Sequence, residues 1–243
     1  MLSSLRALAF QASFIVWTIG LCLVMLPVAP FTSGAGFRGW ARFWEGGVLW
    51  LLRRVVGIAL LVRGAPPAEP VLIAAKHQSV LETLVFHRLV PNVAVPLKQE
   101  LTRIPLFGRY LVKAGCIPVD RGAGAAAMRW LFRDAEARVA EGLSLLVFPE
   151  GTRVRVGETG AYRPGIAGLY LALGRPVVPV ALLTGHVWGR GFLGKRPGTA
   201  VIAFLEPIEP GLDRRQFMRL LEERIETASA ALAAEFDAPR TRA

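Results

Sequence analysis

The feature that most constrains this chain is a long uncharged segment near its N-terminus. No charged residue occurs from Ala7 to Phe37, and the apolar part runs from Leu8 to about Leu26. A helix of about 20 apolar residues is long enough to cross the hydrocarbon core of a bilayer. The sequence therefore predicts an N-terminal helix that associates with a membrane.

A cleaved signal peptide and a buried helical hairpin are the alternatives. Only Arg6 precedes the apolar segment as a charged residue, and no small-residue cleavage pattern stands out. The segment is also longer than the ~7–15 apolar residues of a signal peptide. A hairpin packed on a soluble core does not require so long a run without charge. We therefore expect a retained membrane anchor.

The next stretch, Gly39 to Arg63, has an amphipathic pattern. At about 100° per residue, Arg42, Glu45 and Arg53 fall in one arc of a helix, and apolar residues lie opposite. This pattern predicts a helix in the membrane interface rather than a second span. Tryptophans favour such interfaces. Four of the six tryptophans lie in the first fifty residues: Trp17, Trp40, Trp44 and Trp50.

Composition and charge point to the same environment. Hydrophobic residues make up 53% of the 243 residues, yet the formal net charge is +11. This combination favours membranes with anionic lipids, or anionic substrates held at a membrane. Nucleic acid is the rival explanation of the charge, but no helix-turn-helix, zinc finger or basic stripe with interleaved aromatics supports it.

Cys22 and Cys116 cannot make a disulfide framework and no Cys/His cluster has zinc spacing, so we expect no metal site.

After a Gly/Pro-rich linker at residues 64–70, short apolar runs alternate with helical patterns. We expect strands at Val71–Ala75, near Val93–Pro96, and at Cys116–Val119, Ser144–Phe148, Val177–Leu183 and Ala200–Leu205. We expect helices at about Val80–Val90, Ala123–Glu141, Pro164–Gly174 and Arg214–Phe236. The alternation predicts an α/β fold with a largely parallel sheet flanked by helices, preceded by the membrane-anchoring helical segment. The expected divisions are membrane-associated helices at 1–64, a folded domain at 71–236 and a disordered tail at 237–243.

A histidine and an acid stand in the loop after the first expected strand. Loops at the carboxyl ends of strands are where open α/β sheets place ligands. Five steps along one helix would turn His77 and Glu82 about 140° apart, so they meet only if His77 lies in the loop and Glu82 in the first helical turn. A carboxylate in that position orients an imidazole that acts as general base. Alternatively, Ser79 and Glu82 form a capping box and His77 is an ordinary loop residue.

A second polar cluster, Phe148-Pro149-Glu150-Gly151-Thr152-Arg153, also follows an expected strand. If both strands run parallel, it lies at the same sheet edge as His77. Glu150 and Arg153 beside Gly151 could clamp a polar headgroup, with the guanidinium binding a phosphate through two hydrogen bonds. The alternative is a surface turn with a local ion pair. No Gly-rich loop with Lys-Ser/Thr and no Gly-x-Ser-x-Gly elbow occurs, which argues against a nucleotide-driven enzyme and a serine lipase.

Together, the His77–Glu82 pair and the block from Phe148 to Arg153 resemble the glycerolipid acyltransferases typified by 1-acylglycerol-3-phosphate acyltransferase. The similarity covers about residues 71–210, in the order and spacing of that family. Further matching segments are Gly115–Arg121, Val177–Leu182, Lys98 ahead of Ile104–Gly108, and Arg163 in Tyr162–Gly165. The chain departs from the family at Glu82, where Asp is usual.

The resemblance implies an enzyme that moves a fatty acyl group from a thioester to the free hydroxyl, at position 2, of lysophosphatidic acid, giving phosphatidic acid. It implies His77 as general base and Glu82 as its orienting partner. The implied substrate-binding residues are Lys98, Arg121, Glu150, Gly151, Thr152 and Arg153. It implies no cofactor, with acyl-coenzyme A or acyl carrier protein as co-substrate, and membrane lipids and a lysophospholipid acceptor as partners.

Two other functions remain open, namely acylation of a different lysolipid such as a lyso-aminolipid, and a catalytically silent lipid-binding protein.

Arginines indicate the orientation in the membrane. Arg6 precedes the apolar segment, whereas Arg38, Arg42, Arg53 and Arg54 follow it. Since positive charges favour the cytoplasmic side, we expect the folded domain on the cytoplasmic face of the inner cell membrane.

Overall fold

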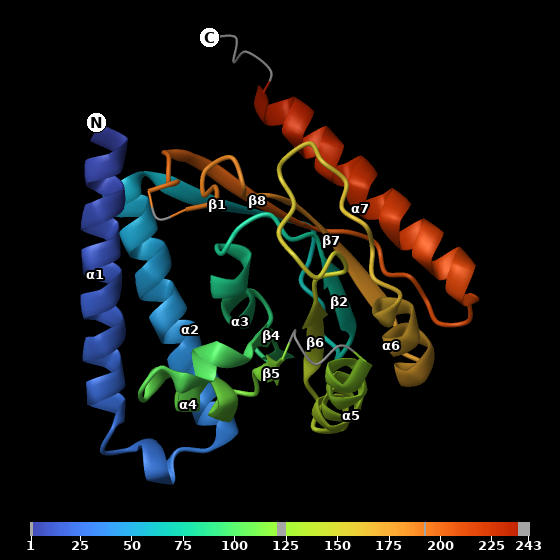
Figure 1. The fold of residues 1–243 in the computed structure, drawn as a ribbon, viewed down its shortest axis with the longest axis horizontal. Coiled ribbons are helices and arrows are strands. Elements are labelled where there is room, and N and C mark those ends of the chain that lie inside the picture. Colours follow the sequence, from blue (N-terminus) through green and yellow to red (C-terminus); the bar gives the residue numbers. More distant parts are fainter. Residues whose placement is uncertain (1, 121–124, 192, 238–243) are drawn as a thin grey trace.

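A computed structural model describes residues 2–120, 125–191 and 193–237 (Figure 1). Its main sheet has six strands in the order β1-β8-β7-β2-β6-β3, and only β7 and β8 pair in antiparallel fashion. The strands are β1 Ile58–Arg63, β2 Leu72–Ala75, β3 Val93–Ala94, β6 Ser144–Val147, β7 Val177–Leu183 and β8 Gly198–Phe204. A second, two-stranded sheet pairs β4 Pro96–Lys98 with β5 Ile117–Val119. The predicted largely parallel α/β sheet is confirmed.

Helices cover both faces of the sheet (Figure 1). One face carries α5 Ala125–Ala140, α6 Gly165–Leu173 and α7 Arg214–Asp237, and the other carries α1 Leu2–Met25, α2 Gly34–Leu51, α3 Phe86–Leu89 and α4 Phe107–Lys113. Successive β2 residues alternate between the two cores: Leu72 and Ala74 pack toward α6 and α7, whereas Ile73 and Ala75 pack toward α1 and α2. Both faces of β2 are therefore buried, as is usual for a central parallel strand.

The register of the parallel strands sets the position of three loops. Leu72 of β2 is opposite Leu145 of β6 on one side and Val177 of β7 on the other. The carboxyl ends of β2, β6 and β7 therefore lie at one edge of the sheet, so the segments that follow them emerge side by side. Both polar clusters found in the sequence follow these strands.

Two expected helices differ from prediction. The helix expected at Gly39–Arg63 is wrong beyond α2. A π-helical turn at Leu52–Val56 leads to Gly57, whose φ of 86° ends the helix. Residues 58–63 then form the edge strand β1. The helix expected at Val80–Val90 is broken into a 3-10 turn at Glu82–Leu84 and the short α3. Of the expected C-terminal tail, Asp237 ends α7 and residues 238–243 lie outside the described residues.

Glu45 is not on an exposed polar face as its spacing suggested, but is 1% exposed. Its Oε1 lies 2.9 Å from Nδ1 of His87, and its Oε2 accepts a 2.8 Å hydrogen bond from the backbone N–H of Arg88. Nε2 of His87 lies 3.7 Å from Sγ of Cys116. Burial alone would lower the pKa of His87, but Cys116 and Glu45 outweigh it and raise that pKa to about 10. The cluster ties α2 to α3 and to the start of β5.

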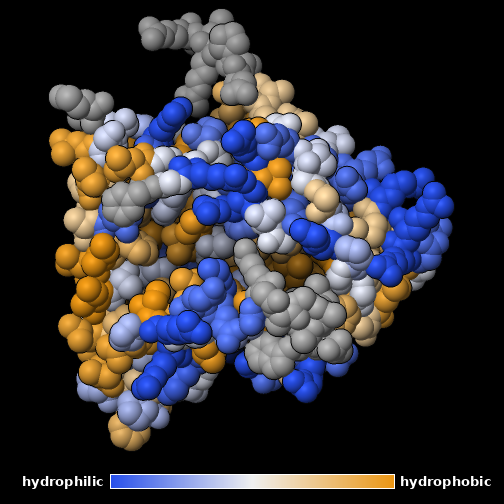
Figure 2. Space-filling model, in the orientation of Figure 1, coloured by the Kyte–Doolittle hydropathy of each residue, from blue (hydrophilic) through white to orange (hydrophobic). Residues whose placement is uncertain are grey.

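Helix α1 packs on the domain along one face only. Nε1 of Trp17 donates to the carbonyl of Trp44, and Nε1 of Trp44 donates to Oγ1 of Thr18, both at 3.0 Å. The opposite face is apolar and exposed, along the left side of Figure 2, and carries Leu5, Leu8, Ile15, Val16, Ile19, Leu23 and Val24. Within the described ranges, this is the one helix long and apolar enough to cross a membrane, with a mean hydropathy of 2.0 over its best window.

The Glu45–His87 pair generates a stability prediction. Replacing Glu45 with Ala leaves a buried imidazole without its carboxylate, so we expect the free energy of unfolding to fall by about 3 kcal/mol. Thermal unfolding in detergent measures it. As a control, replacing the exposed Arg53 with Ala should change the stability by no more than about 0.5 kcal/mol. Equal stability of the two variants would contradict the prediction.

Candidate active site

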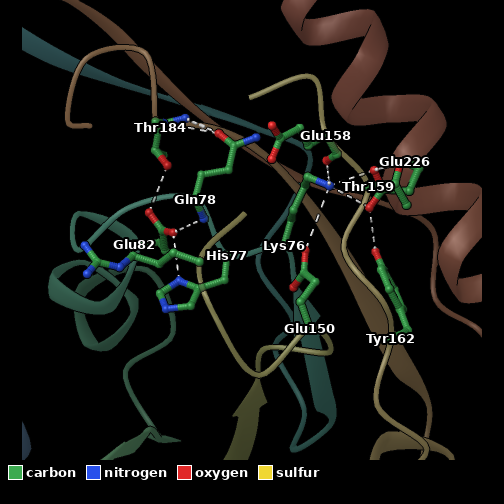
Figure 3. A network of polar contacts seen from close by, with 12 residues as sticks. Lys76, His77, Gln78, Glu82, Glu150, Glu158, Thr159, Tyr162, Thr184 and Glu226 are labelled. Carbon is green, nitrogen blue, oxygen red and sulfur yellow. Dashed lines mark hydrogen bonds and ion pairs between the residues drawn. The ribbon is translucent and has the colours of Figure 1, made fainter. Parts of the chain in front are cut away.

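His77 and Glu82 meet at the carboxyl end of β2, in the one arrangement that their spacing allowed. His77 lies in the loop directly after β2, and Glu82 is the first residue of the following 3-10 turn. Nδ1 of His77 is 3.0 Å from Oε1 of Glu82, and the two side chains are 9% and 0% exposed. The contact is drawn in Figure 3.

Glu82 is held by several donors besides the imidazole. Its Oε1 accepts 2.6 Å hydrogen bonds from the backbone N–H groups of Gln78 and Ser79, and its Oε2 accepts one of 2.8 Å from Oγ1 of Thr184. The capping-box alternative is therefore partly realised, because Glu82 bonds back to Ser79 while also contacting His77. One carboxylate both orders the turn and orients the imidazole.

The hydrogen bonding indicates the tautomer of His77. Oε1 of Glu82 already accepts two backbone N–H groups, so it acts as an acceptor toward Nδ1 as well. In the neutral imidazole Nδ1 would then carry the ring proton and Nε2 the lone pair. The ring of Phe148 stacks on the imidazole at 4.1 Å between centroids and 21° between planes, which restricts rotation of the imidazole. This arrangement suits a general base whose free nitrogen accepts a proton.

Side-chain and backbone contacts join the loops after β2, β6 and β7. Oε1 of Gln78 accepts hydrogen bonds from the backbone N–H groups of Thr184, at 2.9 Å, and Gly185, at 3.2 Å. The carbonyl of His77 accepts a 2.7 Å hydrogen bond from the backbone N–H of Val154. The segment that carries the imidazole is therefore anchored on both sides.

An apolar pocket of about 170 Å³ opens beside Phe148, the residue that stacks on His77. Arg163 is the charged residue among those that line it, and its backbone N–H donates to the carbonyl of Pro149 at 2.8 Å. Pockets of this kind bind apolar groups and orient them with few polar side chains. The lining residues are Pro96, Leu97, Val119, Val147, Phe148, Pro149, Gly151, Arg163, Gly165, Ile166 and Leu169.

The other predicted site residues lie at different depths. Gly151 lines the pocket with a φ of 66°, where a side chain would be strained. Thr152 is exposed and Arg153 is half-buried, with its carbonyl accepting a hydrogen bond from Nη2 of Arg190. Lys98 is on the surface in a 2.9 Å ion pair with Glu100. Arg121 lies outside the described residues.

Glu150 faces inward rather than toward the pocket, whose walls include its neighbours Pro149 and Gly151. The residue is 1% exposed and its Oε1 lies 3.9 Å from Nζ of Lys76 (Figure 3). Among the residues that the structure describes, neither carboxylate oxygen has a hydrogen-bond partner. Desolvation raises the pKa of Glu150 to about 7, although Lys76 opposes the rise. A carboxyl group with such a pKa titrates near neutral pH, which is common at functional sites.

Three residues of the site were not predicted from the sequence: Gln78, Phe148 as a platform for the imidazole, and Thr184. One signal could have identified Thr184, because it follows strand 177–183 directly and so lies at the same sheet edge as His77.

Among the residues that the structure describes, no group of three or more His, Cys, Asp or Glu side chains is arranged to hold a metal ion.

Comparisons with known proteins identify the family of this chain and its fold. A family model described as Acyltransferase matches residues 60–183. The chain is 35% identical over 196 residues to a 1-acyl-sn-glycerol-3-phosphate acyltransferase of Pseudomonas aeruginosa, covering 79% of this chain and 74% of that protein. It is 28% identical to the enzyme of the same name from Cocos nucifera, covering 86% of this chain and 68% of that protein.

Among solved structures, the 1-acyl-sn-glycerophosphate (LPA) acyltransferase PlsC from Thermotoga maritima has the same fold. The TM-score is 0.76 at 21% sequence identity, and the match covers 96% of this chain and 95% of the other. The chain therefore belongs to the acyltransferase family. Within that family its type is that of the 1-acyl-sn-glycerol-3-phosphate acyltransferases, so the resemblance found in the sequence is confirmed.

The pKa of Glu150 predicts a pH-dependent stability. A carboxyl group whose pKa rises from 4.5 to about 7 on folding binds its proton more tightly in the native state. Stability from this group is therefore lost as the pH rises from 4.5 to about 7, by roughly 3 kcal/mol at most. Glu150→Gln removes this loss, so its Tm should exceed that of the wild type at pH 8 by more than at pH 5. Thermal unfolding at the two pH values measures the difference, and a constant Tm offset would contradict the assignment.

Proposed function

We propose that this chain transfers a fatty acyl group from an acyl thioester to the free hydroxyl, at position 2, of lysophosphatidic acid, with His77 as general base. The observation that carries the proposal is the His77–Glu82 pair, because the carboxylate orients an imidazole that stacks on Phe148, a residue lining the apolar pocket. The curated relatives named above support lysophosphatidic acid as the acceptor.

In this reaction Nε2 of His77 takes the proton of the acceptor hydroxyl as its oxygen attacks the thioester carbonyl carbon. A C–O bond forms, the tetrahedral intermediate collapses, and the C–S bond breaks. The imidazolium returns its proton to the leaving thiolate, so the base is regenerated and no other reactant is consumed. Glu82 stabilises the imidazolium between these steps through the 3.0 Å contact with Nδ1. A positioned base contributes about 10²–10⁴ in rate, and alignment of the reactants supplies more.

Arginine side chains on the segment after β6 suit a phosphate monoester, and one of them, Arg163, lines the pocket. Arg153 and Arg163 lie on the segment after β6 that also supplies Phe148, and a guanidinium meets phosphate oxygens in a planar fork. Gly151 allows the backbone to approach the headgroup closely. We propose Thr152, Lys98 and Arg121 as further contributors to headgroup binding. Glu150 would act indirectly, because its side chain is turned toward Lys76.

The donor is proposed to be acyl-coenzyme A or acyl carrier protein, and the reaction as written needs no further cofactor. Helix α1 supports a site held at the membrane, since its exposed apolar face gives the enzyme a means to reach a lysolipid within the bilayer. The excess of arginines after the apolar segment supports a cytoplasmic orientation of the domain at the inner membrane.

Mutation of His77 tests the proposed base. We expect His77→Ala to lower kcat for lysophosphatidic acid by about 10²–10⁴-fold in detergent, with the protein still folded. The assay offers acyl-coenzyme A or acyl carrier protein thioester with lysophosphatidic acid and a panel of other lysolipids. Preference for a lyso-aminolipid would keep the mechanism and change the substrate, whereas absence of turnover in the wild type would favour a silent lipid-binding protein.

Mutation of Arg153 tests headgroup binding. We expect Arg153→Ala to raise KM for lysophosphatidic acid by about tenfold or more without changing KM for the thioester donor, because the guanidinium binds only the phosphate. Steady-state kinetics with each substrate varied in turn measures the two constants. Arg155→Ala, at an exposed position two residues away, is the matched control. Equal changes in both KM values would contradict this role.

A further inference from the structure

We propose that Glu226 of α7 is a positioning residue for the proposed base His77, acting through the buried Lys76. The inference rests on the proposed function, because it assigns Glu226 a part in orienting the group that takes the proton. It also extends the working site to a helix outside residues 60–183, the part that the family model matches.

Lys76 and His77 are adjacent and their side chains point to opposite faces of the sheet (Figure 3). The backbone N–H of Lys76 donates to the carbonyl of Val180 at 3.0 Å, which continues the β2–β7 pairing by one residue. Along an extended strand, neighbouring side chains alternate in direction. The position of the Lys76 side chain on one face therefore sets the position of the imidazole on the other.

The ammonium of Lys76 is fixed by carboxylate and carbonyl oxygens. Nζ lies 2.6 Å from both Oε1 and Oε2 of Glu226 and donates to the carbonyl of Glu158 at 3.2 Å. The side chain of Lys76 is 2% exposed. A buried ammonium is strongly unfavourable unless it is paired, so the carboxylate of Glu226 determines where Lys76 can lie.

Glu226 also holds the segment between Glu150 and Arg163. The hydroxyl of Tyr162 donates to its Oε1 at 3.0 Å, and Oγ1 of Thr159 donates to its Oε2 at 3.2 Å. Gly160, between these two residues, packs so closely on Glu150 that an added Cβ would lie 3.0 Å from Cγ of Glu150. One carboxylate on α7 thus joins the end of β2 to the segment that follows β6.

The charges in this cluster make Glu226 the main partner of Lys76. Two carboxylates share one buried cation, and Glu226 takes both short contacts while Glu150 remains 3.9 Å from Nζ. If the negative charge of Glu226 is removed, Glu150 becomes the nearest carboxylate to the ammonium. Lys76 would then shift toward the β6 loop, and the backbone of His77 would shift with it.

Two substitutions of Glu226 distinguish positioning from packing. Glu226→Gln keeps the shape and loses the charge, whereas Glu226→Asp keeps the charge and loses one methylene. We expect Glu226→Gln to lower kcat by about 10–100-fold, the effect of misplacing a reacting group by about 1 Å, with a smaller change in KM for lysophosphatidic acid. Glu226→Asp should retain more activity than Glu226→Gln. Near-normal kcat in Glu226→Gln, or a larger loss in Glu226→Asp, would overturn the proposal.

A readout independent of turnover is the imidazole NMR signal of His77, assigned with His77→Ala among the three histidines. We expect Glu226→Gln to shift this signal, and Tyr162→Phe, which removes one donor to Glu226 and keeps the ring, to shift it less. Glu223→Gln, at an exposed position on the same helix, is the control and should leave it unchanged. An unchanged His77 signal in a folded Glu226→Gln protein would overturn the positioning role of Glu226, whether or not the wild type is active. Inactivity of the wild type on every lysolipid would instead refute the proposed function. Should Glu226→Gln fail to fold, Tyr162→Phe carries the same test.

Discussion

The parallel pairing of β2 with β6 and β7 is the constraint on which the rest of the site depends. It brings three strand ends to one edge, where β2 is followed by His77, β6 by Phe148 and β7 by Thr184. The imidazole, the ring that stacks on it and a hydroxyl that fixes its carboxylate partner come from three separate loops. A one-residue slip of β2 would exchange the faces on which Lys76 and His77 lie, because side chains alternate along a strand.

Buried charges then order these loops before any substrate arrives. Glu82 is surrounded by four donors, and Lys76 by the oxygens of Glu226 and a backbone carbonyl. Burial of a charge is unfavourable unless hydrogen bonds and an opposite charge compensate, so each group has one favourable arrangement. Such preorganisation is what a general-base site requires. Glu150 is the exception, since its carboxylate oxygens have no hydrogen-bond partner in the described part of the chain and its pKa is raised to about 7.

The N-terminal helices are attached to the same region of the domain. The ring of Phe10 on α1 packs edge-on against Trp188, with 5.7 Å between ring centroids, and Trp188 lies in the connection from β7 to β8 that begins with Thr184. The Glu45–His87 pair attaches α2 to α3, directly after the turn that contains Glu82. The apolar surface of α1 is therefore held in a defined position relative to the His77–Glu82 pair, which suits an acceptor that is itself a membrane lipid.

Local patterns in the sequence determined most of the secondary structure. The strand at Val177–Leu183 has its predicted bounds, and the last helix, predicted at Arg214–Phe236, ends one residue later. The end of α6 at Gly174, with a φ of 55°, was also predictable, because glycine at a helix end signals its own conformation. The contact between His77 and Glu82 was one of two arrangements that the sequence allowed, since the residues are five positions apart and meet only if His77 lies in the loop.

Only the tertiary structure decided which groups come into contact when they lie far apart in the sequence. Glu45 has the spacing of an exposed polar face, but its partner His87 is 42 residues away. Lys76 and Glu226 are 150 residues apart, and Glu82 and Thr184 are 102 apart. Residues 58–63 have an apolar pattern that suits a helix or a strand, and pairing with β8 made them a strand. The physical reason is the same in each case: periodicity records which face of an element is apolar, whereas the partner of a buried charge or an edge strand is set by packing between distant segments.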